Sequence, residues 1–298
     1  MDLLSRQASS HLQQHNNGRG GSQLFTRMKL LKVFAGAIVI IPLALEGYAQ
    51  SGPVQTVLDI FHSSNLDDET KSITSDTQDV TFIFHGAGGQ DANTDELLQV
   101  LRKGKRNNSF IKMVDWSQDS ADILQASVKG SKIGEALGKQ FARLLQSQDT
   151  VQRRNVHIIG ISVGAFPASA LVQTLDGTLR PSLRKKINLQ LTLLDPFQQK
   201  AVLGIKYGKK NFGKGCDYAQ QYLNTDDPVP STNDPLPYCA TTDVTSLRPS
   251  EVFGHDWPLI YYSNELKEMQ KNETLGGSRD LPMIPIEMRR KIGETIVL

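Results

Sequence analysis

Ser162 lies within GISVG (160–164), directly after the apolar run NVHIIGI (155–161). A serine becomes a nucleophile when a nearby base removes its proton, an acid orients that base, and N–H groups stabilise the oxyanion that forms. Glycines two residues before and after the serine let a strand and the next helix pack closely around a sharp turn. Five residues also fit an ordinary glycine-marked turn, so the other groups must be found elsewhere in the chain.

The stretch FIFHGAGG (82–89) offers a candidate for oxyanion stabilisation. A strand that ends in a glycine cluster upstream of the serine lets a backbone N–H approach the substrate carbonyl. We expect the N–H groups of Ala87 and Val163 to form this pair, with Gly86 as the alternative to Ala87. A Gly-rich turn between a strand and a helix would look the same. His85 is expected to pack and hydrogen-bond rather than to act as a base.

The candidate base is His255, in FGHDW, one of six histidines in the chain. It follows the last expected strand and precedes the last expected helix, which fits the chain order serine, acid, histidine. A loop histidine without a catalytic role is the alternative. The remaining histidines lie in the polar leader, ahead of the sheet or within a strand: His11, His15, His62 and His157.

Two places in the sequence offer the acid. Asp195 follows the apolar run LTLL, and Asp226 and Asp227 follow the next expected strand in LNTDDPVP. Each lies at the carboxyl end of a strand, where ligands bind in open α/β sheets. A turn aspartate beside a proline is the alternative explanation in both places. The residues alone therefore leave the choice open.

Strand-like and helix-like segments alternate from residue 50 onward, which predicts an α/β fold with a mostly parallel central sheet and helices on both faces. The expected strands are 79–86, 110–116, 155–161, 187–197 and a short one within 216–230, and the expected helices are 91–104, 123–146, 164–175 and 257–270.

The composition of the N-terminal part predicts a targeting region. Residues 1–27 are polar and of low complexity, which predicts a disordered leader. Residues 28–49 combine a basic flank, a short apolar run and small residues before Ala49, which predicts a signal peptide cut after that residue. A bilayer span takes roughly 20 apolar residues, and an uncleaved anchor is the alternative. Both interpretations place the domain in the secretory pathway or outside the cell.

The rest of the chain is expected to hold one domain, 50–275, with a lid-like insertion at 198–238 and a C-terminal tail at 276–298. In a secreted chain, the two cysteines, Cys216 and Cys239, are expected to form a disulfide. Two buried free thiols are the alternative.

The composition excludes some classes of function. With 39% hydrophobic residues and a net charge of +2 over 298 residues, the chain has an ordinary globular composition. The basic residues form no long block, so no nucleic-acid partner is expected. The sequence has neither an H-E-x-x-H motif nor a cysteine cluster, and we expect no metal and no cofactor.

Together these residues resemble the α/β-hydrolase lipases, and the pancreatic-lipase-like branch in particular, over residues 79–270. The resemblance implies the α/β-hydrolase fold, a lid with the cysteine pair at its base, and Asp195 as the acid. It is carried by FIFHGAGG, MVDWS (113–117), HIIGISVGAF (157–166) and LTLLDPF (191–197).

Two features depart from that branch. Ile161 precedes the serine where the family usually has histidine, and DDPVP and HDWPLIYY are similar to the acid and histidine segments of the class 3 lipases. The second likeness implies Asp227 as the acid, and of the two we favour Asp195. The branch's β-sandwich domain has no counterpart here, so no colipase partner is implied.

The resemblance implies a secreted serine hydrolase that cleaves carboxyl esters through an acyl-enzyme. Acyl lipids at a membrane or lipid–water interface are the expected substrates, as for a triacylglycerol lipase, a phospholipase A1 or an esterase. One alternative is a non-catalytic binding protein with the same fold. Another is a thioesterase or other acyl hydrolase, because one scaffold carries several such activities.

Overall fold

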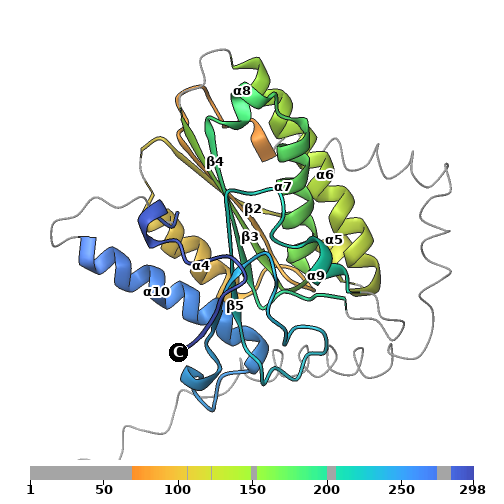
Figure 1. The fold of residues 1–298 in the computed structure, drawn as a ribbon, viewed down its shortest axis with the longest axis vertical. Helices are drawn as coiled ribbons and strands as arrows, with labels where there is room; N and C mark the ends of the chain where they lie inside the picture. Colours follow the sequence, from red (N-terminus) through yellow and green to blue (C-terminus); the bar gives the residue numbers. More distant parts are fainter. Residues whose placement is uncertain (1–68, 106, 122, 149–152, 200–205, 274–282) are drawn as a thin grey trace, which may run out of the picture. The chain divides into compact units, whose positions relative to one another are not determined.

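The chain folds around a seven-stranded sheet with the order β2-β1-β3-β4-β5-β6-β7, in which every neighbouring pair is parallel (Figure 1). The structure is a computed structural model and describes residues 69–105, 107–121, 123–148, 153–199, 206–273 and 283–298. The strands are β1 (Asp79–Phe84), β2 (Ser109–Val114), β3 (Arg154–Ile161), β4 (Ile187–Leu194), β5 (Tyr218–Leu223), β6 (Ala240–Asp243) and β7 (Thr295–Val297).

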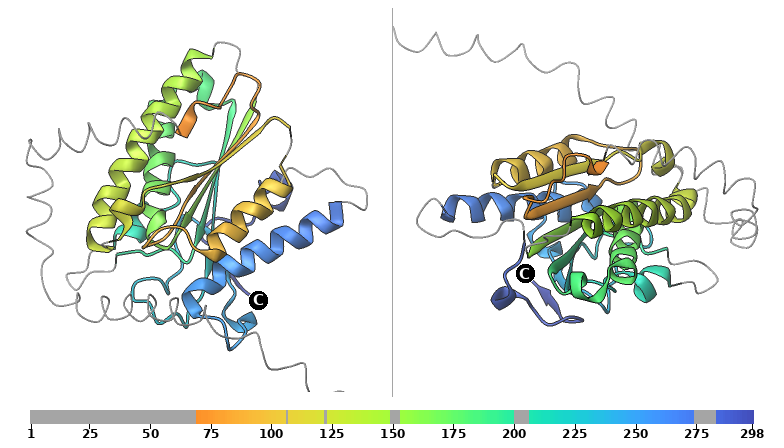
Figure 2. Two further views of the ribbon diagram at one scale, coloured as in Figure 1. Left: turned by 180° about the vertical axis from the view of Figure 1, so that it is seen from behind. Right: turned by 90° about the horizontal axis from the view of Figure 1, so that it is seen from above.

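Long helices cover both faces of the sheet, as Figures 1 and 2 show. Helices α4 (Ala92–Lys103) and α10 (Trp257–Glu273) lie on one face, and α6 (Ile123–Ser147) and α7 (Ala165–Thr178) lie on the other. The short helices are α5 (Ser117–Ser120), α8 (Pro181–Arg184) and α9 (Tyr207–Asn211), and the single 3-10 turns are η1 (Ser162–Gly164), η2 (Thr245–Leu247), η3 (Gly254–Asp256) and η4 (Ile286–Met288).

Alternate residues of the strands build the two apolar layers. Ile83 and Ile159 belong to the buried cluster that also contains residues of α4 and α10. Phe82, the neighbour of Ile83, points to the other face, where its ring meets that of Phe141 on α6 with centroids 5.4 Å apart. Side chains alternate along a strand, so a continuous apolar run is buried on both faces, as parallel strands require.

Glycines on α6 allow α7 to approach it closely. A Cβ atom added at Gly134 would lie 2.0 Å from the carbonyl oxygen of Pro167, and one at Gly138 would lie 2.8 Å from the Cβ of Thr174. Any larger residue at these positions would push the two helices apart. This contact fixes the first turn of α7, and with it the turn that carries Ser162.

The fold class predicted from the sequence is confirmed, and each expected strand and helix is present. Two strands were not expected: β6, and β7 at the end of the segment 276–298 that we interpreted as a tail. In addition, β5 lies between β4 and β6 in the sheet. The expected lid-like range 198–238 therefore contains a core strand.

The disulfide expected between Cys216 and Cys239 is not formed, since both cysteines are free. The Cys216 thiol donates a hydrogen bond to the carbonyl oxygen of Gly213, with Sγ and O 3.4 Å apart. Burial raises the pKa of both thiols, that of Cys216 to about 12. The two side chains are neutral thiols, which corrects the prediction in favour of its alternative.

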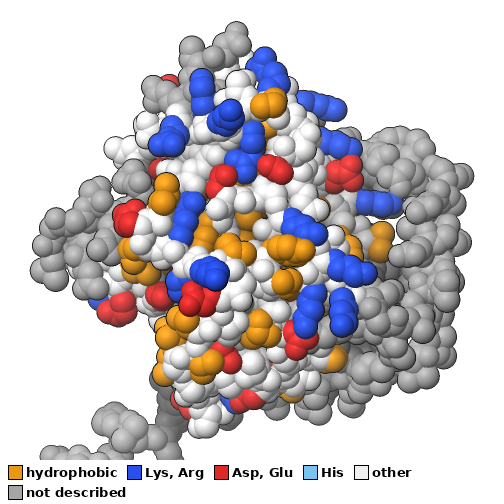
Figure 3. All heavy atoms as spheres, in the orientation of Figure 1, with side chains coloured by type: hydrophobic (Ala, Val, Ile, Leu, Met, Phe, Trp, Pro, Cys, Tyr) orange, Lys and Arg blue, Asp and Glu red, His pale blue; other side chains and the backbone are white. Residues whose placement is uncertain are grey.

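The expected leader and signal peptide, residues 1–49, lie outside the described residues. Among the helices that the structure describes, none has the length and hydropathy of a transmembrane span. Lys and Arg side chains are spread over the face seen in Figure 3, with Asp and Glu side chains among them.

Candidate active site

Ser162 occupies a strained turn between β3 and α7. Its φ of 53° lies in the left-handed region, which costs free energy for a residue with a Cβ and is typical of functional sites. A Cβ at Gly160 would lie 2.8 Å from the carbonyl oxygen of Gly164, and one at Gly164 would lie 2.3 Å from that of Phe84. The Phe197 N–H donates to the Ser162 carbonyl oxygen at 3.1 Å. The two glycines are thus required by close backbone contacts on either side of the serine.

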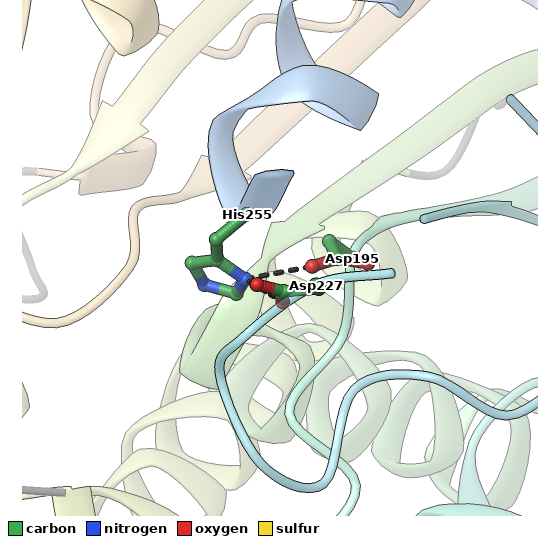
Figure 4. A group of neighbouring side chains, drawn as sticks. All are labelled: Asp195, Asp227 and His255. Carbon is green, nitrogen blue, oxygen red and sulfur yellow. Dashed lines mark hydrogen bonds and ion pairs between the residues drawn. The ribbon is translucent and has the colours of Figure 1, made fainter. Parts of the chain in front are cut away.

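His255 connects Ser162 to both candidate acids. Its Nε2 lies 2.8 Å from Ser162 Oγ, and its Nδ1 lies 2.7 Å from Asp195 Oδ2 and 2.8 Å from Asp227 Oδ2. The residue belongs to η3, the short turn before α10. In Figure 4 both carboxylates approach the same nitrogen of the ring. The structure therefore brings together the serine, the histidine and two of the three aspartates that the sequence singled out.

Asp195 directly follows β4 and is almost fully buried, with 1% of its surface exposed. Its φ is 45°, also left-handed, and its N–H continues the sheet by donating to the Tyr222 carbonyl oxygen. Besides His255, its carboxylate accepts a 3.3 Å hydrogen bond from the Asn224 N–H.

Asp227 lies in the turn that follows β5 and is also buried. Its Oδ1 accepts the N–H of Val229 at 2.9 Å, and its Oδ2 accepts the hydroxyl of Thr232 at 2.7 Å. Its neighbour Asp226 points away and pairs with Arg248 at 2.8 Å. Asp226 is therefore not part of the group around His255.

The three titratable groups shift one another's pKa values. Burial raises the pKa of Asp195 well above its usual range, more than the hydrogen bond and charge of His255 lower it. Burial also acts to raise the pKa of Asp227, but hydrogen bonds from His255, Asp195 and Val229 outweigh it and lower that pKa to about 2. Burial acts to lower the pKa of His255, whereas the hydrogen bonds and charges of both aspartates raise it to about 10.

The segment expected to bind an oxyanion lies beside the serine. A Cβ at Gly86 would lie 3.3 Å from Ser162 Cβ and 4.0 Å from its Oγ. Ala87 follows Gly86 in the chain, and Val163 follows Ser162 in η1. Three backbone N–H groups thus come from the two segments that flank the serine side chain.

His85 holds this segment in place. The buried ring lies 2.9 Å from the Gly86 carbonyl oxygen through Nδ1 and accepts the Trp116 N–H at Nε2, 3.3 Å away. The Trp116 indole N–H donates in turn to the His85 carbonyl oxygen at 3.1 Å. Burial lowers the pKa of His85, so the ring is neutral and fixes the backbone, as the sequence suggested.

One group within the described residues has atoms that could hold a metal ion. Asp195, Asp227 and His255 offer ligand atoms that all lie within 4.8 Å of one another. The same atoms already hydrogen-bond with each other, and we therefore assign no metal to this group. Of the other histidines, His157 is buried in β3 against Thr192, and His11, His15 and His62 lie outside the described residues.

Two residues near the acids were missed in the sequence. Asn224 is fully buried, and its amide donates to the Gly254 carbonyl oxygen at 2.8 Å, next to His255. Thr232 donates to Asp227. The position of Asn224 directly after a strand was a usable signal, because the carboxyl ends of the strands hold the site. Nothing in the sequence around Thr232 pointed to its contact.

The arrangement is that of the α/β-hydrolase fold: a serine on the turn after β3, aspartates after later strands, and a histidine before the last helix. No protein-family model matches the chain, and no curated protein does.

Two solved structures are similar to the chain at low scores. One is the Trichoderma reesei cutinase in complex with a C11Y4 phosphonate inhibitor, at 14% identity over 75% of this chain and 92% of that chain, with a TM-score of 0.35. The other is Aspergillus fumigatus lipase B, at 12% identity over 53% of this chain and 41% of that chain, with a TM-score of 0.30. Likenesses at TM-scores this low support neither a family nor an activity. The resemblance to the pancreatic-lipase-like branch therefore stays a prediction.

Proposed function

We propose that the protein is a serine hydrolase that cleaves carboxyl esters. The observation that carries the proposal is the continuous line of hydrogen bonds from Ser162 Oγ through the His255 ring to buried carboxylates. A serine hydroxyl is a weak nucleophile, and such a line activates it because the histidine accepts its proton while the carboxylate stabilises the imidazolium. The left-handed backbone of Ser162 also supports a functional role.

The proposed reaction has two steps. Ser162 Oγ attacks the ester carbonyl carbon while His255 Nε2 takes the hydroxyl proton, and the carbonyl oxygen becomes an oxyanion. The oxyanion collapses, the carbon–oxygen bond to the alcohol breaks, and His255 returns the proton to the leaving alkoxide. Water then attacks the acyl carbon while His255 Nε2 takes one of its protons. The bond between this carbon and Ser162 Oγ breaks, and His255 returns the proton to Oγ, which releases the acid and restores Ser162.

The N–H groups of Ala87 and Val163, with Gly86 as the alternative to Ala87, are proposed to stabilise the oxyanion. Removal of one such donor typically costs about 10²–10³ in kcat. His85 and Trp116 support this role because their hydrogen bonds fix the Gly86 segment.

Acyl lipids remain the proposed substrate class. Aromatic rings line the beginning of α7: Phe166, four residues after Ser162, has ring centroids 5.2 Å from those of both Tyr207 and Phe212 and 6.4 Å from that of Phe197. Phe166 and Phe212 are 1% and 0% exposed, so these rings belong to the core behind the serine turn. The acyl-lipid proposal therefore rests on the sequence resemblance. Action at a lipid surface, secretion and the signal peptide are proposals that rest on the sequence alone.

A fluorophosphonate probe tests the activity, because it labels only a serine activated in this way. We expect the wild-type protein to be labelled and Ser162→Ala not to be. Ser169→Ala is the matched control, since Ser169 is a buried serine of α7 whose hydroxyl has no hydrogen-bond partner. A wild-type protein that resists the probe would contradict the proposal and favour the non-catalytic alternative. Hydrolysis of short-chain, long-chain and thioester substrates by the labelled protein then separates the ester hydrolases from the thioesterase.

A further inference from the structure

Two carboxylates share one nitrogen of His255, although a serine–histidine pair needs only one acid. Asp195 Oδ2 and Asp227 Oδ2 lie 2.7 and 2.8 Å from Nδ1 (Figure 4). Their side chains are 2% and 0% exposed, and that of His255 is 13% exposed. Water therefore screens the repulsion between the two carboxylates only weakly.

The charges of this group restrict its protonation. Two ionised carboxylates beside a neutral imidazole would bury two uncompensated negative charges, which is strongly unfavourable. One extra proton must therefore sit on the imidazole or on a carboxyl group. A proton on the imidazole leaves Nε2 as a donor to Ser162, unable to accept the serine proton. The form that can activate Ser162 thus has the extra proton on a carboxyl group.

The hydrogen bonds decide which carboxyl group that is. Asp227 accepts the Val229 N–H at 2.9 Å and the Thr232 hydroxyl at 2.7 Å in addition to His255. Asp195 has only the longer 3.3 Å bond from Asn224 besides His255. Donors favour the charged form of a carboxyl group, and burial without donors favours the neutral form.

We propose, building on the hydrolase function above, that Asp227 is the ionised acid of the site and that Asp195 is a neutral carboxylic acid that donates its proton to Asp227. The two aspartates then carry one negative charge between them. The charge of Asp195 is one of the causes that raise the pKa of His255, so a neutral Asp195 lowers that pKa and favours the neutral imidazole that can accept the Ser162 proton. The donors that Asp227 has and Asp195 lacks carry this assignment, and the opposite pKa shifts of the two aspartates agree with it.

The charged neighbours leave this balance undisturbed. Asp226, on the turn of Asp227, is paired with Arg248. Asp256, next to His255 in η3, has an interaction of its own. At the end of β1, His85 is neutral and engaged with Gly86 and Trp116. The main charges acting on His255 are therefore those of the two aspartates.

The exchange of single aspartates for asparagine tests the assignment. An amide offers one donating and one accepting side, as a neutral carboxylic acid does, so Asp195→Asn mimics the proposed state. We expect it to lower kcat only a few-fold. Asp227→Asn should lower kcat by about a hundredfold, because Asp195 must then ionise with fewer donors. The double variant should lose about 10⁴, the loss typical of a site without its acid.

Asp226→Asn is the matched control, since it removes a neighbouring carboxylate that does not touch His255. If Asp227→Asn does not fold, Thr232→Val removes only the hydroxyl donor and should lower kcat, with Thr232→Ser restoring it. A larger loss for Asp195→Asn than for Asp227→Asn would overturn the proposal. So would equal losses in both single variants.

A measurement without turnover separates this proposal from the hydrolase function. Nitrogen NMR of the His255 ring at pH 7 should show a proton on Nδ1 and none on Nε2, in the wild type and in Asp195→Asn alike. Protons on both ring nitrogens in the wild type would place the extra proton on the imidazole and refute the assignment. The NMR result holds whether or not Ser162 reacts with a probe, so either proposal can fail alone.

Discussion

A methyl group at position 164 would collide with the end of β1. A Cβ at Gly164 lies 2.3 Å from the Phe84 carbonyl oxygen and 2.7 Å from that of His85. The first distance is about 1 Å short of an ordinary van der Waals contact. Both atoms belong to the backbone, so no side-chain rotation relieves the clash. The φ of Gly164 is −60°, which any residue adopts, so the effect of Gly164→Ala is purely steric.

The expected loss in stability follows from this overlap. Overpacking of a buried site costs about 1–3 kcal/mol, occasionally more, and the rigid backbone here places Gly164→Ala at about 3 kcal/mol. The displaced β1 end also carries Gly86 and Ala87, the proposed oxyanion segment. A shift of about 1 Å in such a site costs about a hundredfold in rate. Urea denaturation measures the first effect, and the rate of fluorophosphonate labelling measures the second.

Gly177→Ala is the control on the same helix. A Cβ at Gly177 meets no atom within 4 Å, and alanine is favoured over glycine in a helix by up to about 1 kcal/mol. This variant should be slightly stabilised and label at the wild-type rate. Gly160→Ala, where the Cβ would lie 2.8 Å from Gly164 O, should fall between the two. The reasoning is refuted if Gly164→Ala unfolds within about 1 kcal/mol of the wild type and labels normally.

Three further outcomes are expected. Burial lowers the pKa of His157 to about 3 from 6.5, so the unfolded chain binds more protons between these values. The contribution of the neutral His157 to the free energy of unfolding is fully present above pH 6.5, and it falls by about 1.4 kcal/mol per pH unit as the pH drops toward 3. Urea titrations should not find this contribution to the slope in His157→Gln. Cys216 and Cys239 should resist a thiol reagent in the native protein and both react in urea without reductant; a lack of reaction would indicate a disulfide. Asn224→Leu removes the donor to Gly254, which should destabilise the protein by about 1–3 kcal/mol and slow labelling, whereas an unchanged labelling rate would show that the His255 turn does not depend on it.

The serine turn was predictable because its determinants are local. Ser162, its two flanking glycines and the change from strand to helix all lie within one short stretch. The main strands β1, β2, β3 and β4 were predictable for a similar reason, since each is a short local stretch rich in apolar residues. The strands β6 and β7 were not, because both are short and neither carries a periodic signal: β6 is mostly polar, with Thr241, Thr242 and Asp243, and β7 has three residues. They form because the edge of β5 has unpaired backbone groups that a further strand satisfies.

The acid could not be chosen from the sequence because the chain offers two in equivalent places. Asp195 follows β4 and Asp227 follows β5, and these strands are parallel neighbours. Their carboxyl ends meet, so both side chains reach the same ring. Only their side-chain contacts distinguish the two aspartates. The hydrogen bond from the Thr232 hydroxyl to Asp227 forms only because the turn after β5 brings the two residues together. The cysteine prediction failed because spacing in the sequence does not show where buried thiol groups point.

The pairing of β3 with β4 links the site to the order of folding. Ile161 pairs with Leu194 in this ladder, and Ser162 and Asp195 are the next residue on each strand. Their separation is therefore fixed by strand register, across a connection that includes all of α7. Parallel pairings over such connections form slowly, because the chain must close a long loop first. Serine reactivity during refolding should therefore appear only when the central strands have paired. The rate at which the protein becomes reactive to a labelling probe would then measure the rate at which the sheet forms.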